Sequence, residues 1–291
     1  MPDFDLASLK PIIVAHFPDL AHARFTLLPP GWHSTAVDVD DDWVFKFPRG
    51  EDAERALRKE ASLLAAVRPH IAMPVPELSL IAGPPLFSRH RKLKGEHLIA
   101  ADYAHLPERA RSGLAAALAR FYADLHGLDT TRMTAAGAAA IRPWLAPDDI
   151  LRKAWPILPA KLRAPTERSV TAWRELAPDP YGTIYGFFDG HGWNMAFDHA
   201  TRRLNGVYDF ADSGLGPLHQ DFIYSNFISR DLTSRIIAGY EHTTGRLLDH
   251  RRIVLLTTIH RLSELAEVAD DPAHIPLMLK HLDAWMRGGV G

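Results

Sequence analysis

Two polar residues on one loop, and a third residue after the next hydrophobic stretch, have side chains suited to phosphoryl transfer. Asp189 and Asn194 lie five residues apart on a glycine-containing loop, and Asp209 follows at an expected strand end. A carboxylate can orient an attacking hydroxyl and accept its proton, while an amide oxygen and a second carboxylate hold Mg²⁺ against nucleotide phosphates. Taken alone, the Asp/Asn pair is also compatible with a turn-capping role, because both residues are common in loops.

A hairpin is expected to hold these groups in one geometry. Residues 195–197 predict a short buried strand, 199–203 a polar turn and 204–208 the returning strand. Asn194 and Asp209 therefore leave opposite ends of one ribbon at the same rim. Such a rigid ribbon suits chemistry that depends on positioning.

A lysine and a glutamate upstream are expected to form an ion pair. Residues 43–48, WVFKFP, alternate with period two and place Lys46 on the face opposite the aromatic side chains. Such a lysine either extends its ammonium to an edge or meets a fixed anion. Residues 51–68 predict an amphipathic helix whose apolar stripe includes Glu60. A carboxylate directed toward a core needs a partner, and Lys46 is the natural one, whereas a solvated edge of the stripe is the alternative for Glu60.

A possible phosphate-covering turn precedes this strand. Ser34 and Thr35 follow Pro-Pro-Gly and lead into a predicted strand at 36–39, so their backbone N–H groups could cover phosphates. A plain hairpin turn fits equally well, because the multiple-glycine phosphate loop is missing.

The pattern of the chain changes near residue 94. Strand signals dominate before it and helix-spaced apolar residues after it, and the polar stretch 89–98 predicts a hinge. We expect an α+β fold with two lobes: residues 1–93 as a nucleotide-binding lobe with an antiparallel sheet and one long helix, and 94–291 as a helical lobe with the catalytic hairpin and an acceptor cleft. His126, on a predicted helix, is expected to be a structural histidine.

Composition excludes several classes of protein. The 291 residues are 47% hydrophobic and 23% charged, with a formal net charge of -2, so nothing favours nucleic acid or an anionic membrane as a partner. The absence of cysteine excludes disulfides and thiolate chemistry, and the 16 histidines are scattered without a zinc-binding pattern. No secretory start and no apolar run approaching about 18 residues is present, so a cytoplasmic protein is expected.

The ordered set Lys46, Glu60, Asp189, Asn194 and Asp209 resembles the aminoglycoside phosphotransferase family of protein-kinase-like small-molecule kinases. The resemblance covers nearly the whole chain, including DDWVFKFPR, the PVP after the Glu60 helix and DFADSGLGPLHQDF. It implies an ATP or GTP donor whose phosphates meet Lys46, paired with Glu60. It also implies Asp189 as the catalytic base and Mg²⁺ on Asn194 and Asp209.

The sequence departs from the family beside the predicted base. Phe187 and Phe188 replace the usual His-Gly, and Gly192 and Trp193 replace Pro-Gly. The departure implies altered room for a substrate and a divergent subgroup with its own acceptor. Two alternatives stay open: a nucleotide-binding regulatory protein of the same fold without chemistry, and a metabolic kinase of an amino alcohol or sugar.

The acceptor is expected to be a small hydroxyl compound. Asp221 follows Asp209 by only twelve positions, which leaves little chain for docking a polypeptide. Asp221 resembles the family's aspartate that braces the catalytic loop, with a helix N-terminal acid as the alternative.

An acidic patch near the C-terminus could attract a cationic acceptor or could be a solvated helix face. It comprises Glu264, Glu267, Asp270 and Asp271.

Overall fold

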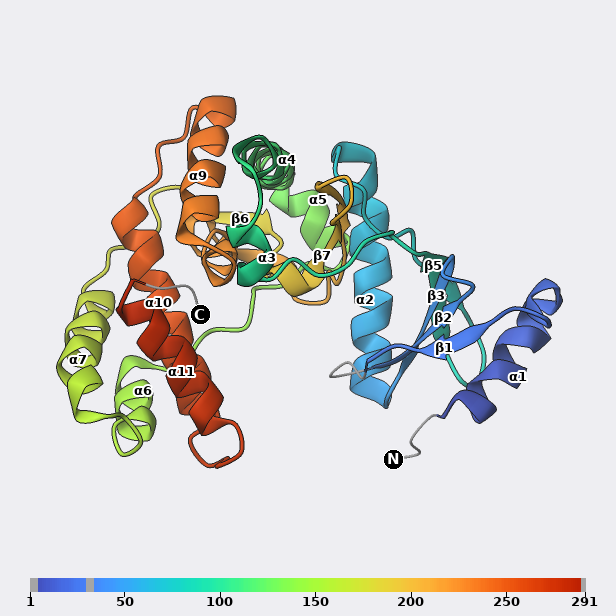
Figure 1. Ribbon diagram of the computed structural model, residues 1–291, viewed down its shortest axis with the longest axis horizontal. Coiled ribbons are helices and arrows are strands. Elements are labelled where there is room, and N and C mark those ends of the chain that lie inside the picture. Colours follow the sequence, from blue (N-terminus) through green and yellow to red (C-terminus); the bar gives the residue numbers. More distant parts are fainter. Residues whose placement is uncertain (1–4, 30–33, 289–291) are drawn as a thin grey trace.

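An antiparallel sheet and a mainly helical region make up the two lobes of the computed structural model, which describes residues 5–29 and 34–288 (Figure 1). The sheet has the strand order β1-β2-β3-β5-β4, with all neighbours antiparallel. Its strands are β1 (Phe25–Leu27), β2 (Ser34–Val39), β3 (Trp43–Pro48), β4 (Ser79–Ile81) and β5 (Phe87–Arg91). The central strand β3 carries Lys46.

Helices cover both faces of this sheet. The aromatic face of β3 packs with Leu9 and Ile13 of α1 (Leu6–His16), and α2 (Glu51–Val67) lies on the opposite face, between the sheet and the helical lobe (Figure 1). Lys46 pairs with Ala36 on β2 and Ser88 on β5, so these residues share the α2 face. The alternation of WVFKFP thus directs the ammonium toward α2.

The connection between the lobes is docked on the loop that carries Asp189 and Asn194, which we call the catalytic loop after its expected role. Strand β5 continues to Arg91, so the predicted hinge at 89–98 is wrong in its first three residues, which the sheet ladder recruits. Beyond β5, Leu98 N–H donates to the carbonyl of Gly192 at 3.0 Å. A Cβ at Gly192 would lie 1.7 Å from the Leu98 carbonyl oxygen, so this close approach requires glycine.

The helical lobe is built around α4 and α9, which pack against each other. Its helices are α3 (Ala100–Ala104), α4 (Glu108–His126), α5 (Thr130–Ala135), α6 (Pro147–Ala154), α7 (Ala160–Arg174), α8 (Leu218–Asp221), α9 (Arg230–Thr244), α10 (His250–Glu267) and α11 (Ile275–Met286). Two short sheets pair β6 (Thr183–Gly186) with β9 (Gly214–Pro217), and β7 (Met195–Asp198) with β8 (Arg203–Val207). The α+β, two-lobed fold predicted from the sequence is confirmed.

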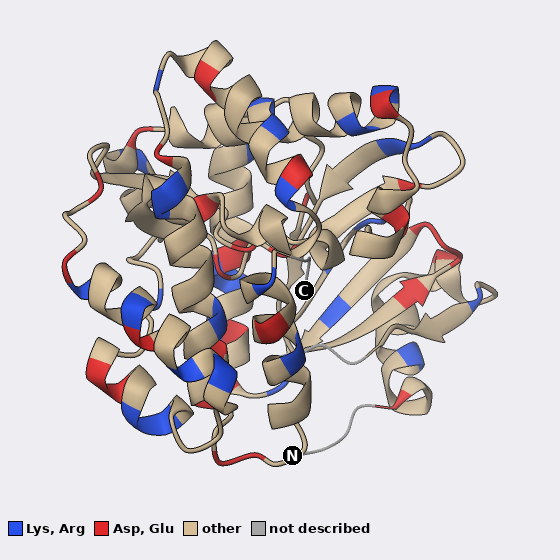
Figure 2. Ribbon diagram, turned by 60° about the vertical axis from the view of Figure 1, so that its left-hand side comes forward, with Lys and Arg blue, Asp and Glu red and all other residues tan. Residues whose placement is uncertain are grey.

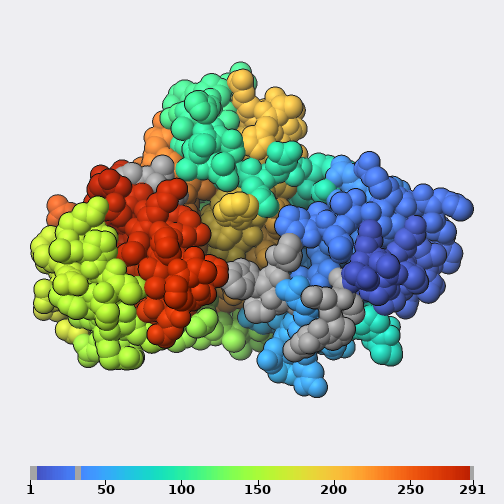
Figure 3. Space-filling view, turned by 60° about the horizontal axis from the view of Figure 1, so that its bottom comes forward, coloured from blue at the N-terminus to red at the C-terminus, as the bar shows by residue number. Residues whose placement is uncertain are grey.

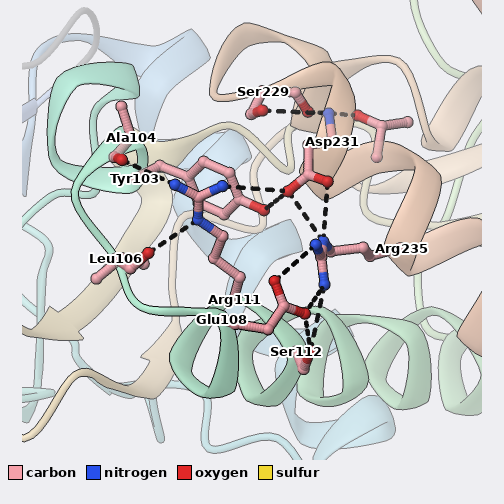
Figure 4. A network of polar contacts seen from close by, with 10 residues as sticks. Tyr103, Ala104, Leu106, Glu108, Arg111, Ser112, Ser229, Asp231 and Arg235 are labelled. Atoms are coloured by element: carbon pink, nitrogen blue, oxygen red, sulfur yellow. Dashed lines mark hydrogen bonds and ion pairs between the residues drawn. The ribbon is translucent and has the colours of Figure 1, made fainter.

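A polar network joins the first helices of this lobe to α9 (Figure 4). Tyr103 on α3 donates its hydroxyl hydrogen to Asp231 at 2.6 Å, and Arg235 on α9 contacts both Asp231 at 2.9 Å and Glu108 on α4. The network therefore fixes the start of the helical lobe to its central helix pair.

Charge is distributed evenly over the protein. Lysine and arginine are interspersed with aspartate and glutamate along the helices rather than gathered on one face (Figure 2). None of the helices in residues 5–29 and 34–288 has the length and apolar character that crossing a lipid bilayer demands.

Candidate active site

The expected ion pair between the sheet and α2 is present. Lys46 Nζ lies 3.5 Å from Glu60 Oε1, and Glu60 is only 3% exposed. The same glutamate oxygen accepts a hydrogen bond from Phe210 N–H at 3.1 Å. Lys46 Nζ also lies 3.8 Å from Asp209 Oδ1 across the site. One ammonium is therefore shared by two carboxylates from different lobes.

This sharing shifts two pKa values in the same direction. Burial would lower the pKa of Lys46, but the charges of Glu60 and Asp209 outweigh burial and raise it. Burial raises the pKa of Glu60, with Lys46 opposing and Asp209 reinforcing the shift. The ammonium is thus held firmly charged, and Asp209 competes with Glu60 for it.

Asp189 is held by its neighbours on the catalytic loop. Asn194 donates from Nδ2 to Asp189 Oδ2 at 2.6 Å and to the Asp189 carbonyl at 3.0 Å. On the other side, His191 Nε2 lies 3.0 Å from Asp189 Oδ1. Burial would lower the pKa of His191, but the contact with Asp189 reverses the shift and raises it. The carboxylate is oriented before any substrate arrives.

The two proposed metal ligands lie at one end of the β7/β8 ribbon. Tyr208 N–H donates to the Asn194 carbonyl at 3.0 Å, which ties the start of the hairpin to its end. Asp209 follows with φ of 67° and a side chain 48% exposed, so its oxygens are accessible. Because Nδ2 of Asn194 is committed to Asp189, its amide oxygen is left for a cation. This oxygen donor set fits Mg²⁺.

Within the described ranges, no group of three or more His, Cys, Asp or Glu side chains is arranged to hold a metal ion. Asn194 and Asp209 supply one amide and one carboxylate. A divalent cation held there would therefore depend on further oxygen ligands, such as phosphates and water, as Mg²⁺ in nucleotide sites commonly does.

A buried carboxylate braces the catalytic loop from below. Asp221 accepts hydrogen bonds from the backbone N–H groups of Phe187 at 2.9 Å and Phe188 at 2.5 Å. His126 Nε2 approaches Asp221 at 2.9 Å, and its Nδ1 contacts the Tyr240 hydroxyl at 3.1 Å. Asp221 is the last residue of the four-residue helix α8 and still lies within its first turn, so it is also an acid near a helix N-terminus. Its hydrogen bonds, however, go to the loop before Asp189. His126 is a structural histidine, as expected.

The two phenylalanines before Asp189 are both buried, but they lie differently relative to the cleft. Phe187 packs against Phe121 and Phe210, and both Phe187 and Phe188 are buried. Phe188 adopts φ of 53°, so the chain turns sharply as it enters the catalytic loop. Of the two aromatics expected to alter the room for a substrate, Phe188 lines the cleft and Phe187 does not.

A cleft of about 270 Å³ lies beside Asp189. The hollow between the lobes in Figure 3 has the chain around the catalytic hairpin, in yellow, at its floor. The cleft is walled by the catalytic loop, the segment before α6, and residues of α10 that include Glu264 and Glu267. Asp270 and Asp271 are exposed and do not line this cleft, so only half of the predicted acidic patch faces it.

A larger hollow of about 410 Å³ lies between α6 and α7, lined by Leu151, Arg152, Trp155, Pro156 and Glu167. None of the predicted site residues lines it. Geometry therefore favours the smaller cleft beside Asp189 for the chemistry.

The predicted phosphate-covering residues are divided between the two sheet faces. Ser34 lies at the start of β2 on the Lys46 face, two residues before Ala36. Thr35 pairs with Phe47, so its side chain is on the α1 face, away from Lys46. The hairpin tip at residues 30–33 lies outside the described residues. A contact of these two residues with phosphates stays a prediction.

Sequence reasoning missed His191 as a member of the site. The signal available was its place two residues after Asp189, on a loop already predicted to be catalytic. The sequence offers no further sign that sets it apart from the other scattered histidines. Its contact with Asp189 depends on the turn of the loop, which composition does not show.

Comparison with known proteins points to one family. A family model described as a phosphotransferase enzyme family matches residues 24–284. No curated protein sequence matched the chain.

Several solved structures share its fold. A mutant of aminoglycoside 2'-phosphotransferase-IIIa with GDP matches with a TM-score of 0.81 and 21% identity, covering 97% of this chain and 98% of that chain. Macrolide 2'-phosphotransferase type I gives 0.69 and 16%, with coverage of 97% and 99%. The streptomycin–ATP ternary complex of APH(2")-IIa gives 0.65 and 16%, with coverage of 100% and 98%.

Proposed function

Because the chain belongs to the phosphotransferase enzyme family, we propose that it transfers the γ-phosphate of ATP or GTP to a hydroxyl group of a small molecule, with Mg²⁺ as cofactor. The observation that carries the proposal is the approach of Lys46 to Asp209, 3.8 Å apart across the two lobes, at the rim where Asn194 holds Asp189. Nucleotide complexes of two proteins with the same fold support a nucleotide donor.

Each proposed role follows from the chemistry of the side chain. Asp189 orients the acceptor hydroxyl and accepts its proton, and Lys46, steadied by Glu60, binds the donor phosphates. Asn194 and Asp209 would hold Mg²⁺, which when bound offsets phosphate charge. The backbone N–H groups of Ser34 and Thr35 would cover the phosphates. Positioning and electrostatics supply the rate enhancement, because phosphoryl transfer needs little covalent chemistry from the protein.

The acceptor is a small molecule. The cleft beside Asp189 holds about 270 Å³, near the lower limit of drug-sized pockets. Glu264 and Glu267 give it acidic groups, although Glu264 already contacts Arg261 at 2.9 Å and Glu267 contacts Arg142 at 3.4 Å. Proteins of the same fold are named for aminoglycosides and macrolides. The acceptor classes to test are therefore aminoglycosides, macrolides and amino alcohols.

An Asp189→Asn variant tests the proposal. We expect turnover with Mg²⁺-ATP or Mg²⁺-GTP and an active acceptor to fall by about 10² to 10⁴, the usual contribution of a general base. Nucleotide affinity should stay nearly unchanged, because Asp189 does not contact the donor in this proposal. Phosphorylated acceptor is measured by mass spectrometry and nucleotide affinity by calorimetry.

Asp198→Asn is the matched control. Asp198 accepts hydrogen bonds from Ala200 and Thr201 at the far end of the same hairpin, and an asparagine oxygen can replace it there. Its turnover should equal that of the wild type. Equal turnover in the Asp189 variant would remove Asp189 from the mechanism, and no transfer by the wild type to any of the three acceptor classes would overturn the proposed function.

A further inference from the structure

One imidazole at the cleft has no part in the mechanism above. His191 lines the cleft with a side chain 25% exposed, and its Nε2 is 3.0 Å from Asp189 Oδ1. Its backbone is fixed on both sides, because Gly190 approaches the Tyr122 hydroxyl and Gly192 approaches the Leu98 carbonyl too closely to admit a Cβ. The position of this ring relative to Asp189 is therefore set by the packing of the loop.

The second ring nitrogen determines which tautomer His191 adopts. Its Nδ1 accepts a hydrogen bond from the backbone N–H of Trp193 at 3.2 Å. A backbone amide always carries its hydrogen, so Nδ1 must present a lone pair to it, and the ring hydrogen of a neutral imidazole resides on Nε2. His191 is consequently a hydrogen-bond donor to Asp189.

The Asp189 carboxylate is thereby held from two sides. His191 donates to Oδ1 and Asn194 donates to Oδ2 at 2.6 Å. Each carboxylate oxygen has two acceptor positions, so one on each oxygen remains for an incoming hydroxyl. Two donors on different oxygens fix the carboxylate plane and hence the direction of these remaining lone pairs.

His191 and Asn194, the two donors to Asp189, differ in their other contacts. Asn194 is a proposed metal ligand, so the orientation of its amide is set by a bound cation as well as by Asp189. His191 has no second ligand in this scheme beyond the Trp193 amide of its own loop. It is the restraint on Asp189 that does not depend on the occupancy of the metal site.

We propose that His191 is a positioning residue, whose Nε2–H fixes the plane of the Asp189 carboxylate for the acceptor hydroxyl. The inference rests on the proposed function of Asp189 as base. A merely structural histidine would instead matter through Nδ1, by accepting the Trp193 N–H and shaping the loop. The two nitrogens thus separate the two roles.

Two conservative variants separate these roles experimentally. The amide nitrogen of glutamine in His191→Gln can replace Nε2, whereas the amide oxygen of asparagine in His191→Asn can replace only Nδ1. We expect His191→Gln to keep kcat within about threefold of the wild type. His191→Asn and His191→Ala should lose about 10- to 100-fold in kcat, the scale of a displacement of about 1 Å at a reacting group.

The split between kinetic constants is a further readout. Acceptor KM and nucleotide Kd should change by less than about threefold in all three variants, because uniform binding is untouched when only the orientation of the base is lost. Restored kcat in His191→Asn together with a loss in His191→Gln would overturn the proposal in favour of the loop-shaping role. Unchanged kcat in His191→Ala would also overturn it.

Nitrogen NMR of the wild-type protein gives a test that does not require turnover. Side-chain ¹⁵N shifts should identify His191 as the Nε2–H tautomer, and Asp189→Asn should perturb the Nε2 resonance. The Nδ1–H tautomer in the wild type would overturn the positioning role. An Nε2–H tautomer in a protein that phosphorylates no acceptor would show that the proposed function fails while the contact itself stands.

Discussion

Two buried carboxylates beside the candidate active site are compensated in different ways. Asp221, 0% exposed, accepts from two backbone N–H groups and lies 2.9 Å from the His126 imidazole. Glu60, 3% exposed, has one backbone donor and one ammonium at 3.5 Å, which it shares with Asp209. The Asp221 cluster is saturated by the protein, whereas the Glu60 cluster is not.

This difference separates a structural polar cluster from the one that we propose to be functional. A buried charge that the fold saturates stabilises a conformation, here the turn at Phe188 with its positive φ. A cation that two carboxylates share at the edge of a cleft keeps the capacity to bind another anion. The comparison therefore supports Lys46 as the phosphate-binding group and Asp221 as the loop brace.

Among the variants that test this comparison, we expect Asp221→Asn to lower the free energy of unfolding most. An amide can accept from one of the two backbone N–H groups but must turn its own N–H₂ toward the other, which leaves buried donors unpaired. Breaking a buried charged network in this way costs about 3 to 5 kcal/mol of the free energy of unfolding. Urea denaturation measures the loss.

Glu60→Gln is the matched variant on the unsaturated side. Its amide oxygen can still accept from Phe210 N–H, and Lys46 keeps Asp209, so we expect a loss below about 1 kcal/mol. Equal losses of unfolding free energy in Asp221→Asn and Glu60→Gln would show that the protein saturates the Glu60 carboxylate as fully as that of Asp221. The distinction between the two clusters would then have to be abandoned.

A second prediction concerns the pH dependence of stability, which should reflect a buried histidine near the charge of Lys46. His90 lies on the same sheet face, next to Ser88, the partner of Lys46 in the ladder, and is only 6% exposed. Burial, and then the charge of Lys46, lower the pKa of His90 to about 3. The folded protein thus keeps this imidazole neutral, while the unfolded chain takes up a proton below its ordinary pKa of 6.5.

The linkage between protonation and folding gives the direction in which pH changes the free energy of unfolding. The contribution of His90 is fully present above about pH 6.5 and is lost as the pH falls toward 3, at about 1.4 kcal/mol per pH unit. Between pH 7 and pH 5 we expect a loss of about 2 kcal/mol, which His90→Leu should abolish. Urea denaturation at both pH values measures it, with the exposed His105→Gln as control. An unchanged pH dependence in His90→Leu would contradict the burial of a neutral ring.

Much of the arrangement of the candidate site can be predicted from local sequence patterns. The alternation in WVFKFP and the stripe of α2 placed Lys46 opposite Glu60, because strand and helix periodicity fix which side chains face one another. The hairpin likewise placed Asn194 and Asp209 at one rim. These predictions needed only neighbouring elements, which the sequence order already specifies.

The contacts that escaped prediction depend on distant elements or on the turn of a loop. His126 and Asp221 lie 95 positions apart, and only the packing of α4 beneath the catalytic loop brings them together. The positive φ of Phe188 goes with the burial of Phe187 rather than its exposure to substrate. Residue types do not encode either feature, so the sequence does not show which of the two phenylalanines faces the cleft.

The smallest effect is expected where the polar network is solvent-accessible. Arg235 on α9 contacts Asp231 and Glu108 (Figure 4). Its side chain is 29% exposed, more than either buried carboxylate compared above. We expect Arg235→Gln to lower the free energy of unfolding by less than about 1 kcal/mol, and the loss to shrink further in about 1 M salt, because exposed ion pairs are weak and screened. Urea denaturation at low and high salt measures both. A salt-independent loss as large as that of Asp221→Asn would mean that the number of charged contacts, rather than burial and saturation, determines which cluster stabilises this fold.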